Sequence, residues 1–388
     1  MKNLESNYLE NTYLATFFLF FIFNFIDRQI GNIFLIISLL LCLINYKILY
    51  EIILVNIKLV ISIIIFSLYI FLIGFYHNTP IAELDNYFRF LLLLPLLLIT
   101  LNESRLLSLL ILSAYAGFLH ALYCNVFLDL DITRFSGTSS SAITYGNMCA
   151  TLLVVCIYFF IYKGMKSIHL IFAILIFSYL FILTGTRGPL IGIVISLIYL
   201  AVTIKNNTNQ NKNFIRPLLV LSILLVSILL IPNQLGERIK EINQINLSEP
   251  LKITDRSLRE RVFYIIYAKE QIQSHPFVGM GPQNLEDKQW QYLKEKNIHE
   301  SGIIRPKDHL HNEFADISVK FGLLSLVLLF LIYFRLIRTG SNEHRVLLNI
   351  LMITLISSQI TQSQLAHHQA ITFFIVLFYL LQPKTKLS

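Results

Sequence analysis

The 388-residue sequence has few charged residues, since aspartate, glutamate, lysine and arginine together make up only 14% of the chain. In soluble globular domains about a quarter of the residues carry charge. Hydrophobic residues make up 55% of this sequence, and its mean hydropathy is +0.66. This composition lies outside the soluble globular range, and we interpret the chain as an integral membrane protein.

Cysteine is also scarce, and all four cysteines lie within or beside hydrophobic runs: Cys42, Cys124, Cys149 and Cys156. No CxxC pair occurs, so neither a disulfide framework nor a cysteine zinc site is indicated. The GxxxxGK[ST] phosphate-binding loop is absent too, and no ATP site is expected. We therefore expect no cofactor and no metal held by cysteines.

Apolar runs recur along nearly the whole chain, each about as long as a helix needs to cross roughly 30 Å of hydrocarbon. Only helices and closed barrels satisfy their backbone groups in lipid, and continuous apolar runs without alternation favour helices. We predict an all-α integral membrane protein with about twelve transmembrane helices. The first, fourth and eleventh spans, near 12–26, 88–101 and 346–360, are short or polar enough to be partly re-entrant.

The chain divides into a membrane bundle of nine spans over 1–232, a large polar loop over 233–313 and three further spans over 314–388. Lysine and arginine are retained in the cytoplasm, and one set of short loops and tails holds most of them. That set includes both termini, which we place in the cytoplasm, so the large loop lies on the outer face. The net charge of +8 reflects this topology and does not indicate nucleic-acid binding.

A few arginines lie in short outer loops, against this bias. Arg187 lies in FILTGTRGPLIG, residues 181–192, where small residues flank it and Pro189 follows at an expected helix start. A guanidinium in such a turn either snorkels to lipid headgroups or binds an anion such as phosphate. Arg89 begins a span on the outer face, where it contacts a lipid phosphate or snorkels.

Residues 254–285 of the large loop predict an amphipathic helix that lies on the membrane surface or caps the bundle. Its broad apolar face contains Val262, Ile265, Ile266, Ala268 and Ile272. The segment SHPFVGMGP follows, in which Gly279 and Gly281 permit a tight turn and a close backbone approach to a ligand.

Three arginines open this helix: Arg256, Arg259 and Arg261. Helix N-termini attract anions, and an arginine there can complete a phosphate site. The alternative is that these side chains solvate the helix and pair with Asp255 and Glu260.

The stretch DHLHNEFADI, residues 308–317, ends the large loop. His309 and His311 alternate, so their side chains point the same way if the segment is extended. A histidine can take a proton from a sugar hydroxyl near neutral pH, and Asn312 is available to orient a substrate or to hold the following helix start. A zinc site with Asp308 or Glu313 is the alternative.

A second pair of histidines, His367 and His368, lies in TQSQLAHHQ, residues 361–369, on the same face. These histidines either form a second polar wall of the site or lie in an interfacial loop.

The order of three motifs resembles the O-antigen ligase and polymerase superfamily of bacterial envelopes. They are TGTRG at 184–188, SLRER at 257–261 leading to HPFVGMGPQNL, and HLHNEFADISVKFGLLSL at 309–326. RFSGTSSSAITYGNMCA, residues 134–150, is similar to a weaker segment of that superfamily. The resemblance covers about 134–335, whereas the first hundred residues match only in their pattern of hydrophobic spans.

This resemblance implies a metal-independent, GT-C-like glycosyltransferase with its active site on the periplasmic face of the bacterial inner membrane. The donor would be an O-antigen glycan on undecaprenyl diphosphate, the acceptor a hydroxyl of lipid A-core oligosaccharide, and membrane lipids would surround both. Arg187 and Arg261 would hold the diphosphate, and His311 would activate the acceptor hydroxyl. His309 occupies a more variable position in the family and ranks second, and Arg259 and Arg89 are further candidates for substrate binding.

Three other functions remain open. An O-antigen polymerase would join glycan to glycan, and a protein O-oligosaccharyltransferase would use a serine or threonine acceptor. A multispan transporter or flippase would show repeated halves and ionisable residues at the membrane midplane. Here the polar clusters lie on one face, which favours an enzyme, while the oligomeric state stays undetermined by the sequence.

Overall fold

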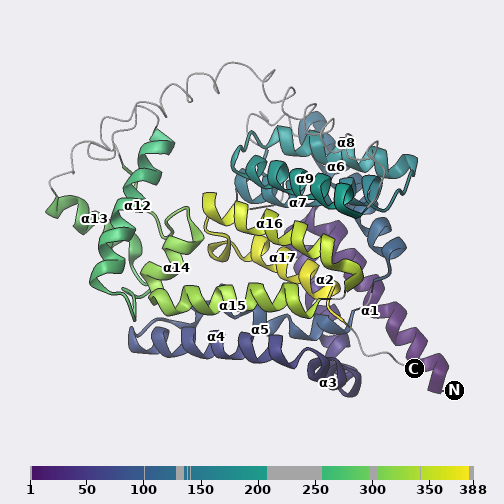
Figure 1. Ribbon diagram of the computed structural model, residues 1–388, viewed down its shortest axis with the longest axis horizontal. Coiled ribbons are helices and arrows are strands. Elements are labelled where there is room, and N and C mark those ends of the chain that lie inside the picture. The colour runs from purple at the N-terminus through teal and green to yellow at the C-terminus, as the bar shows by residue number, and fades with distance from the viewer. Residues whose placement is uncertain are drawn as a thin grey trace.

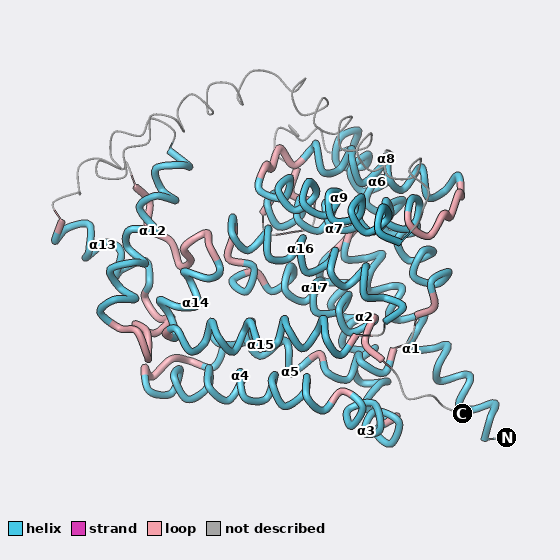
Figure 2. Tube along the Cα trace, in the orientation of Figure 1, coloured by secondary structure: helices cyan, strands magenta, loops and turns pink. Residues whose placement is uncertain are grey.

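The computed structural model describes residues 2–99, 101–127, 135–137, 139, 141–207, 256–296, 304–340 and 342–383. These residues form helices and loops, with no strand among them (Figure 2). Up to residue 207 the helices are α1 (Lys2–Asn24), α2 (Arg28–Ile44), α3 (Tyr46–Val55), α4 (Ile57–Tyr76), α5 (Ile81–Leu92), η1 (Leu94–Leu98), α6 (Glu103–Phe127), α7 (Ala142–Ile161), α8 (Ile168–Leu183) and α9 (Gly188–Asn207). From residue 256 they are α12 (Arg256–Ser274), α13 (Leu285–Glu295), α14 (Glu313–Phe321), α15 (Leu323–Thr339), η3 (Asn342–His344), α16 (Arg345–Thr361), η4 (Gln364–Ala366) and α17 (His368–Leu380).

Four helices are long and apolar enough to cross a membrane, namely α4, α6, α7 and the part of α9 over Gly188–Lys205. The pair α2 and α3, bent by 90°, makes a fifth if it forms one span. Residues Asn11–Asn24, α8, α16 and α17 are apolar but shorter. These helices fit a multi-pass membrane protein. The count of twelve spans and their orientation stay predictions. The ninth expected span, near 216–232, and the domain boundary at 232 lie outside the described residues.

Two expected spans are interrupted. In the fourth, α5 gives way after Leu92 to the short 3-10 helix η1, which has Pro95 near its start. Proline lacks the N–H that an α-helix needs at an interior position, so the helix cannot continue through it. The tenth expected span, near 314–334, is divided at Gly322, whose φ of +82° separates α14 from α15.

The centre of the bundle is α7, which is buried along almost its whole length. It packs against α8, α9, α16 and α17, while α4 packs against α15 and α1 against α2 (Figure 1). Large apolar side chains such as Phe75, Leu119 and Leu175 remain exposed on the outer helices. An apolar outer surface of this kind suits a lipid environment.

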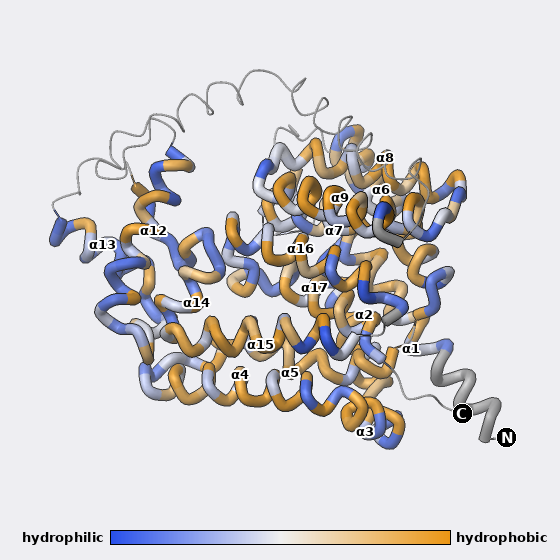
Figure 3. Tube along the Cα trace, viewed as in Figure 1, coloured by the Kyte–Doolittle hydropathy of each residue, from blue (hydrophilic) through white to orange (hydrophobic). Residues whose placement is uncertain are grey.

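The helices α12 and α13 lie at one end of the bundle, beside α14 (Figure 1). They have a small core of their own, which contains Phe263, Tyr264, Tyr267, Leu285, Tyr292, Leu293, Leu310 and Val319. Hydrophilic residues gather in this end of the molecule (Figure 3). The site described below lies where this small unit meets the bundle.

The predicted amphipathic helix is confirmed as α12, but its buried face differs from the expected one. Val262 and Ala268 are buried as expected, whereas Ile265 is 59% exposed. Tyr264 and Tyr267 are buried in its place, because they face α13 and the loop before α14. Aromatic bodies with a polar tip can be buried when the hydroxyl finds a partner.

Candidate active site

Asn312 fixes the loop that precedes α14. It is the N-cap of that helix, and its side-chain oxygen accepts a hydrogen bond from the Ala315 N–H at 3.0 Å. Its amide nitrogen donates to the carbonyl oxygen of Ile360 at 3.1 Å. Capping of this kind satisfies a helical N–H group that otherwise lacks a partner. Of the two roles expected for Asn312, the structure shows that of holding the helix start.

A buried ion pair fixes the backbone between the two histidines of the same loop. The Asp316 carboxylate, which is fully buried, accepts the Leu310 N–H at 2.9 Å and pairs with the Lys320 ammonium at 2.8 Å. Removing one partner of a buried pair leaves the other charge uncompensated, which is strongly destabilising. The pair therefore holds His309 and His311, which flank Leu310, in one arrangement.

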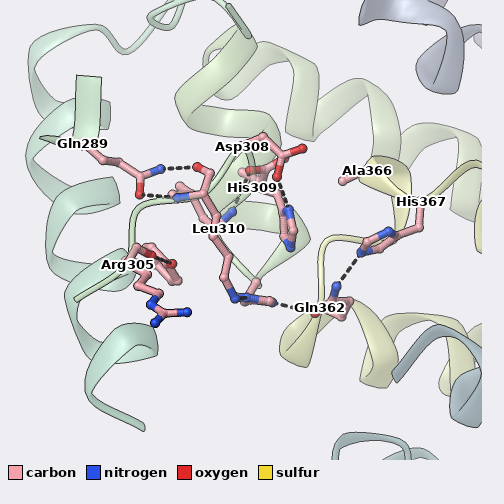
Figure 4. Close-up of polar contacts among 12 residues, drawn as sticks. Gln289, Arg305, Asp308, His309, Leu310, Gln362, Ala366 and His367 are labelled. Atoms are coloured by element: carbon pink, nitrogen blue, oxygen red, sulfur yellow. Dashed lines mark hydrogen bonds and ion pairs between the residues drawn. The ribbon is translucent and has the colours of Figure 1, made fainter. Parts of the chain in front are cut away.

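The helices α12 and α13 hold the earlier part of this loop. Gln289 is fully buried, and its amide nitrogen donates to the Lys307 carbonyl oxygen at 2.7 Å. In return, its amide oxygen accepts the Lys307 N–H at 3.2 Å (Figure 4). The Tyr264 hydroxyl donates to the carbonyl oxygen of Arg305 at 2.7 Å. The small unit of α12 and α13 thus positions the loop that carries the histidines.

Three histidine rings lie together at this place (Figure 4). The ring of His309 is 4.6 Å from that of His311 and 5.2 Å from that of His367, measured between centroids. Gln362 connects two of them, with Oε1 at 2.6 Å from His311 Nδ1 and Nε2 at 2.5 Å from His367 Nε2. His311 has a φ of +52°, so the loop is not the extended segment that the alternation suggested. The two rings are neighbours nonetheless. His367 lies beside them, as expected if it forms a second polar wall of the site.

The charges around the cluster act on its titration. Burial lowers the pKa of His311 to about 3, helped by the nearby charges of His309, Lys307 and Arg261. A hydrogen bond from His309 lowers the pKa of Asp308 to about 2. At neutral pH the imidazole of His311 is therefore neutral and the carboxylate of Asp308 is ionised.

Arg261 and the loop that contains Arg187 converge on this cluster. Arg261 is half-buried on α12 and is close enough for its charge to act on His311. Arg187 is half-buried in the turn before α9, whose first residue Gly188 packs on the end of α16. A Cβ at Gly188 would lie 2.5 Å from the Thr361 hydroxyl, in the residue directly before Gln362. Segments that lie more than a hundred residues apart in the sequence thus meet at one end of the bundle.

The remaining arginines stand in different surroundings. Arg259 is half-buried on α12. Arg89 forms an ion pair with Asp85 at 2.7 Å and donates to the Thr372 hydroxyl of α17 at 2.8 Å, so it joins α5 to α17. Arg256 pairs with Glu260 at 2.9 Å, which is the pairing that the sequence offered as an alternative to phosphate binding.

The glycine-containing turn after α12 has a structural partner. Gly279 and Gly281 have φ values of +64° and +78°. The Met280 N–H donates to the Val319 carbonyl oxygen at 2.7 Å, and the Gly281 N–H donates to that of Lys320 at 3.0 Å. A Cβ at Gly279 would lie 2.6 Å from the same Lys320 oxygen. The close backbone approach that the sequence assigned to a ligand is therefore made to the end of α14.

Four residues of this site were not singled out by sequence reasoning: Gln289, Lys307, Asp316 and Gln362. The position of Lys307, four residues before His311, was a weak signal for its role. Gln289 and Gln362 gave no such signal, because their partners lie far away in the sequence. Among the described residues, no group of three histidine, cysteine, aspartate or glutamate side chains is arranged to hold a metal. Glu313, one proposed zinc ligand, instead accepts the Leu365 N–H at 2.7 Å.

These features define an all-helical, multi-pass membrane protein with histidines and arginines gathered at one end of its bundle. The model of the O-antigen ligase family matches residues 171–330. That segment runs from α8 into α15 and includes the turn of Arg187, the helix of Arg261 and the loop of His309 and His311. The match covers less than half of the chain and supports a member of the O-antigen ligase and polymerase superfamily, as the motifs predicted. No curated protein matches the chain.

Proposed function

We propose that the protein is an O-antigen ligase. It transfers an O-antigen glycan from undecaprenyl diphosphate to a hydroxyl of lipid A-core oligosaccharide, at the periplasmic face of the bacterial inner membrane. The family match, which covers the turn of Arg187, the helix of Arg261 and the histidine loop, carries this proposal. The lipid A-core acceptor is preferred because the chain length, the span pattern and the HLHNEF form most closely resemble the ligases of the superfamily.

In this reaction an acceptor hydroxyl attacks the anomeric carbon, and the bond from that carbon to the diphosphate oxygen breaks. The leaving diphosphate gains negative charge, which Arg187 and Arg261 stabilise as planar donors that match phosphate oxygens. Each such preorganised donor contributes about 3 kcal/mol to transition-state stabilisation. Arg259 adds positive charge on the same helix, and Arg89 contacts the lipid-linked substrate from α5. A histidine of the 309–311 loop takes the hydroxyl proton, a role that the family resemblance gives to His311.

Complementation of a ligase-deficient Gram-negative strain tests this proposal. The strain must still make its own core and polymerised O-antigen, and wild type, Arg187→Ala and Arg261→Ala are expressed at matched levels. Wild type should restore a ladder of lipid A-linked O-chains, measured on a lipopolysaccharide gel. Each arginine variant should lose about 100-fold of the transfer rate, because about 3 kcal/mol of stabilisation is removed.

The control is Arg338→Ala, which removes an exposed arginine at the other end of α15 and should leave the ladder intact. If wild type restores no ladder although lipid-linked polymer accumulates, the same plasmids are moved into a polymerase-deficient strain. Ladders in that strain would establish a polymerase and end the ligase proposal. Glycan found on a protein serine or threonine would instead establish a protein O-oligosaccharyltransferase.

A further inference from the structure

The helices α6 and α8 pack against each other at one side of the bundle (Figure 1). Between them lies a groove with a volume of about 610 Å³. One face of each helix lines the groove, since the lining residues recur at intervals of three and four. They include Tyr115, Phe118 and Leu119 from α6 and Phe172, Leu175 and Tyr179 from α8. Leu119 and Leu175 are 63% and 58% exposed, so the groove opens to the surroundings of the bundle.

Contacts between the two helices hold this groove in shape. The Tyr115 hydroxyl lies 3.1 Å from His169 Nδ1, and the two rings meet edge-on with centroids 6.3 Å apart. The rings of Phe118 and Tyr179 also meet edge-on, at 6.2 Å. Aromatic pairs in this arrangement are stabilised beyond the area that they bury. The groove is therefore part of the packing of α6 against α8.

Polar residues lie at the end of the groove where α8 begins. His169 extends the lining face of α8 by one turn, and it is exposed. On α6, the exposed residues Ser104 and Ser108 precede Tyr115 on the same face of the helix. The groove is thus apolar along its length and polar at one end. This order matches a phospholipid, which has an apolar acyl chain and a polar headgroup.

The same end carries an excess of positive charge. Lys163 pairs with Glu103, while Lys166 and Arg105 are exposed. Glu343 lies close enough for its charge to act on the same groups as that of Glu103. Three basic residues therefore face two acidic ones, on the side that the charge bias of the loops predicts to be cytoplasmic. Basic pockets between transmembrane helices on that side suit anionic headgroups.

We propose that the groove binds one anionic phospholipid, with an acyl chain between α6 and α8 and the phosphate beside Lys166 and His169. From Phe172 to Tyr179 the groove follows about 10 Å of α8, at about 1.5 Å per residue. Half of the hydrocarbon core is about 15 Å thick, so a chain from one leaflet can fill the groove. No residue of the histidine cluster lines it. The inference is therefore independent of the proposed glycan transfer.

Native mass spectrometry of the full-length, delipidated protein in detergent tests this site. The probes are dioleoylphosphatidylglycerol and dioleoylphosphatidylcholine, which share their acyl chains and differ in net charge. Wild type should bind its first phosphatidylglycerol about tenfold more tightly than phosphatidylcholine. Lys166→Gln should lower this preference about fivefold, which is the effect of one basic residue near an anionic headgroup.

Filling the groove should remove the bound lipid. Leu119→Trp and Leu175→Trp place a larger side chain in the groove, and each should lower binding of the first phosphatidylglycerol about tenfold. The matched control is Ile171→Trp, at a position of α8 that is 39% exposed and does not line the groove. Lys58→Gln removes an exposed lysine at the start of α4, on the same predicted side, and should keep the preference for phosphatidylglycerol. Fluorescence-detected size exclusion of each variant verifies that the fold is kept.

Three results would overturn the proposal. If the two groove variants bind phosphatidylglycerol as tightly as Ile171→Trp does, the lipid lies elsewhere on the bundle. If wild type binds both phospholipids equally, or if Lys166→Gln keeps the full preference, the headgroup is not recognised at this end. If undecaprenyl phosphate displaces phosphatidylglycerol from wild type and the groove variants do not bind it, the occupant is a polyprenyl chain and not a phospholipid.

Discussion

Glu313 is a fully buried carboxyl group between the two loops that form the candidate site. One oxygen accepts the Leu365 N–H at 2.7 Å, and the other is buried with no hydrogen-bond partner among the described residues. Burial, aided by the negative charge of Asp316, raises the pKa of Glu313 to about 8 from an ordinary value of 4.5. At neutral pH this carboxyl group is therefore protonated, and it joins the start of α14 to the turn before α17.

The pH dependence of stability should report this group. Because the folded-state pKa of about 8 lies above the unfolded value of 4.5, the contribution of Glu313 is complete below about pH 4.5 and is lost as pH rises through 8. Glu313→Gln mimics the neutral form and lacks this loss. From pH 5 to 9 we expect wild type to lose on the order of a few kcal/mol relative to Glu313→Gln, measured as a falling difference in melting temperature in detergent.

The comparison with Glu313→Gln cancels the histidines, whose titration is common to both proteins. Glu286→Gln, at an exposed position on α13, serves as the control and should run parallel to wild type at every pH. Parallel curves for Glu313→Gln and wild type would mean that the buried carboxyl group is ionised in the fold.

At the scale of the elements, the junction of α14 and α15 joins the small unit to the membrane bundle. Gly322 has a φ of +82° and a ψ of 169°, a region that only glycine adopts readily. The Leu323 N–H donates to the Pro276 carbonyl oxygen at 2.8 Å. The Tyr69 hydroxyl of α4 lies 2.8 Å from the carbonyl oxygens of Phe277 and Phe321. The turn after α12 is thereby held against both α4 and the break between the helices.

A pair of glycine substitutions should separate backbone strain from collision. Gly322→Ala adds a Cβ that meets the Phe277 carbonyl group, whereas Gly164→Ala adds one at a φ of +68° with no atom within 4 Å. We expect Gly164→Ala to cost about 1 kcal/mol, for the left-handed conformation alone. Gly322→Ala should cost at least about 3 kcal/mol, because strain and collision add.

Thermal unfolding of the detergent-purified variants, followed by fluorescence-detected size exclusion, measures both costs. The Gly322 variant should also lose the proposed glycan transfer, since the histidine loop leads directly into α14. Equal melting temperatures for the two variants would show that the junction yields to the added methyl group.

At the scale of the whole molecule, the helices of the bundle are mostly apolar, and hydrophilic residues gather around α12, α13 and the loop before α14 (Figure 3). The charge bias of the loops predicts that this end lies outside the cytoplasm. All four native cysteines are buried, so a single introduced cysteine can be labelled against a low background. The exposed positions His275, after α12, and Lys166, between α7 and α8, are predicted to lie on opposite sides of the membrane.

Labelling with a membrane-impermeant maleimide tests this topology. In cells with a permeabilised outer membrane, His275→Cys should react at once, because it lies in the predicted periplasmic loop. Lys166→Cys should react only after the inner membrane is broken. If only Lys166→Cys reacts while the inner membrane is unbroken, the topology is the reverse of the predicted one and the candidate site lies on the cytoplasmic side.

The amino-acid sequence by itself determined the class of this protein and the residue types of its site. Long apolar runs specify helices in lipid because nothing else satisfies the backbone there, and this argument needs no tertiary contact. The same holds for α12, which has local helical periodicity, and for the motifs around Arg187, Arg261 and His311, which are contiguous in the chain. Their family resemblance is therefore a property of the linear sequence.

Only the tertiary structure decided how these pieces meet. Gln362 lies 51 residues from His311 and Gln289 lies 18 residues from Lys307, so no local pattern links them. The division at Gly322 follows from close packing against the turn after α12, which a hydropathy pattern does not register. The hydrogen bonds of the His311 ring are made to Lys307 and Gln362. That is a property of side chains brought together from distant segments, and local sequence does not encode it.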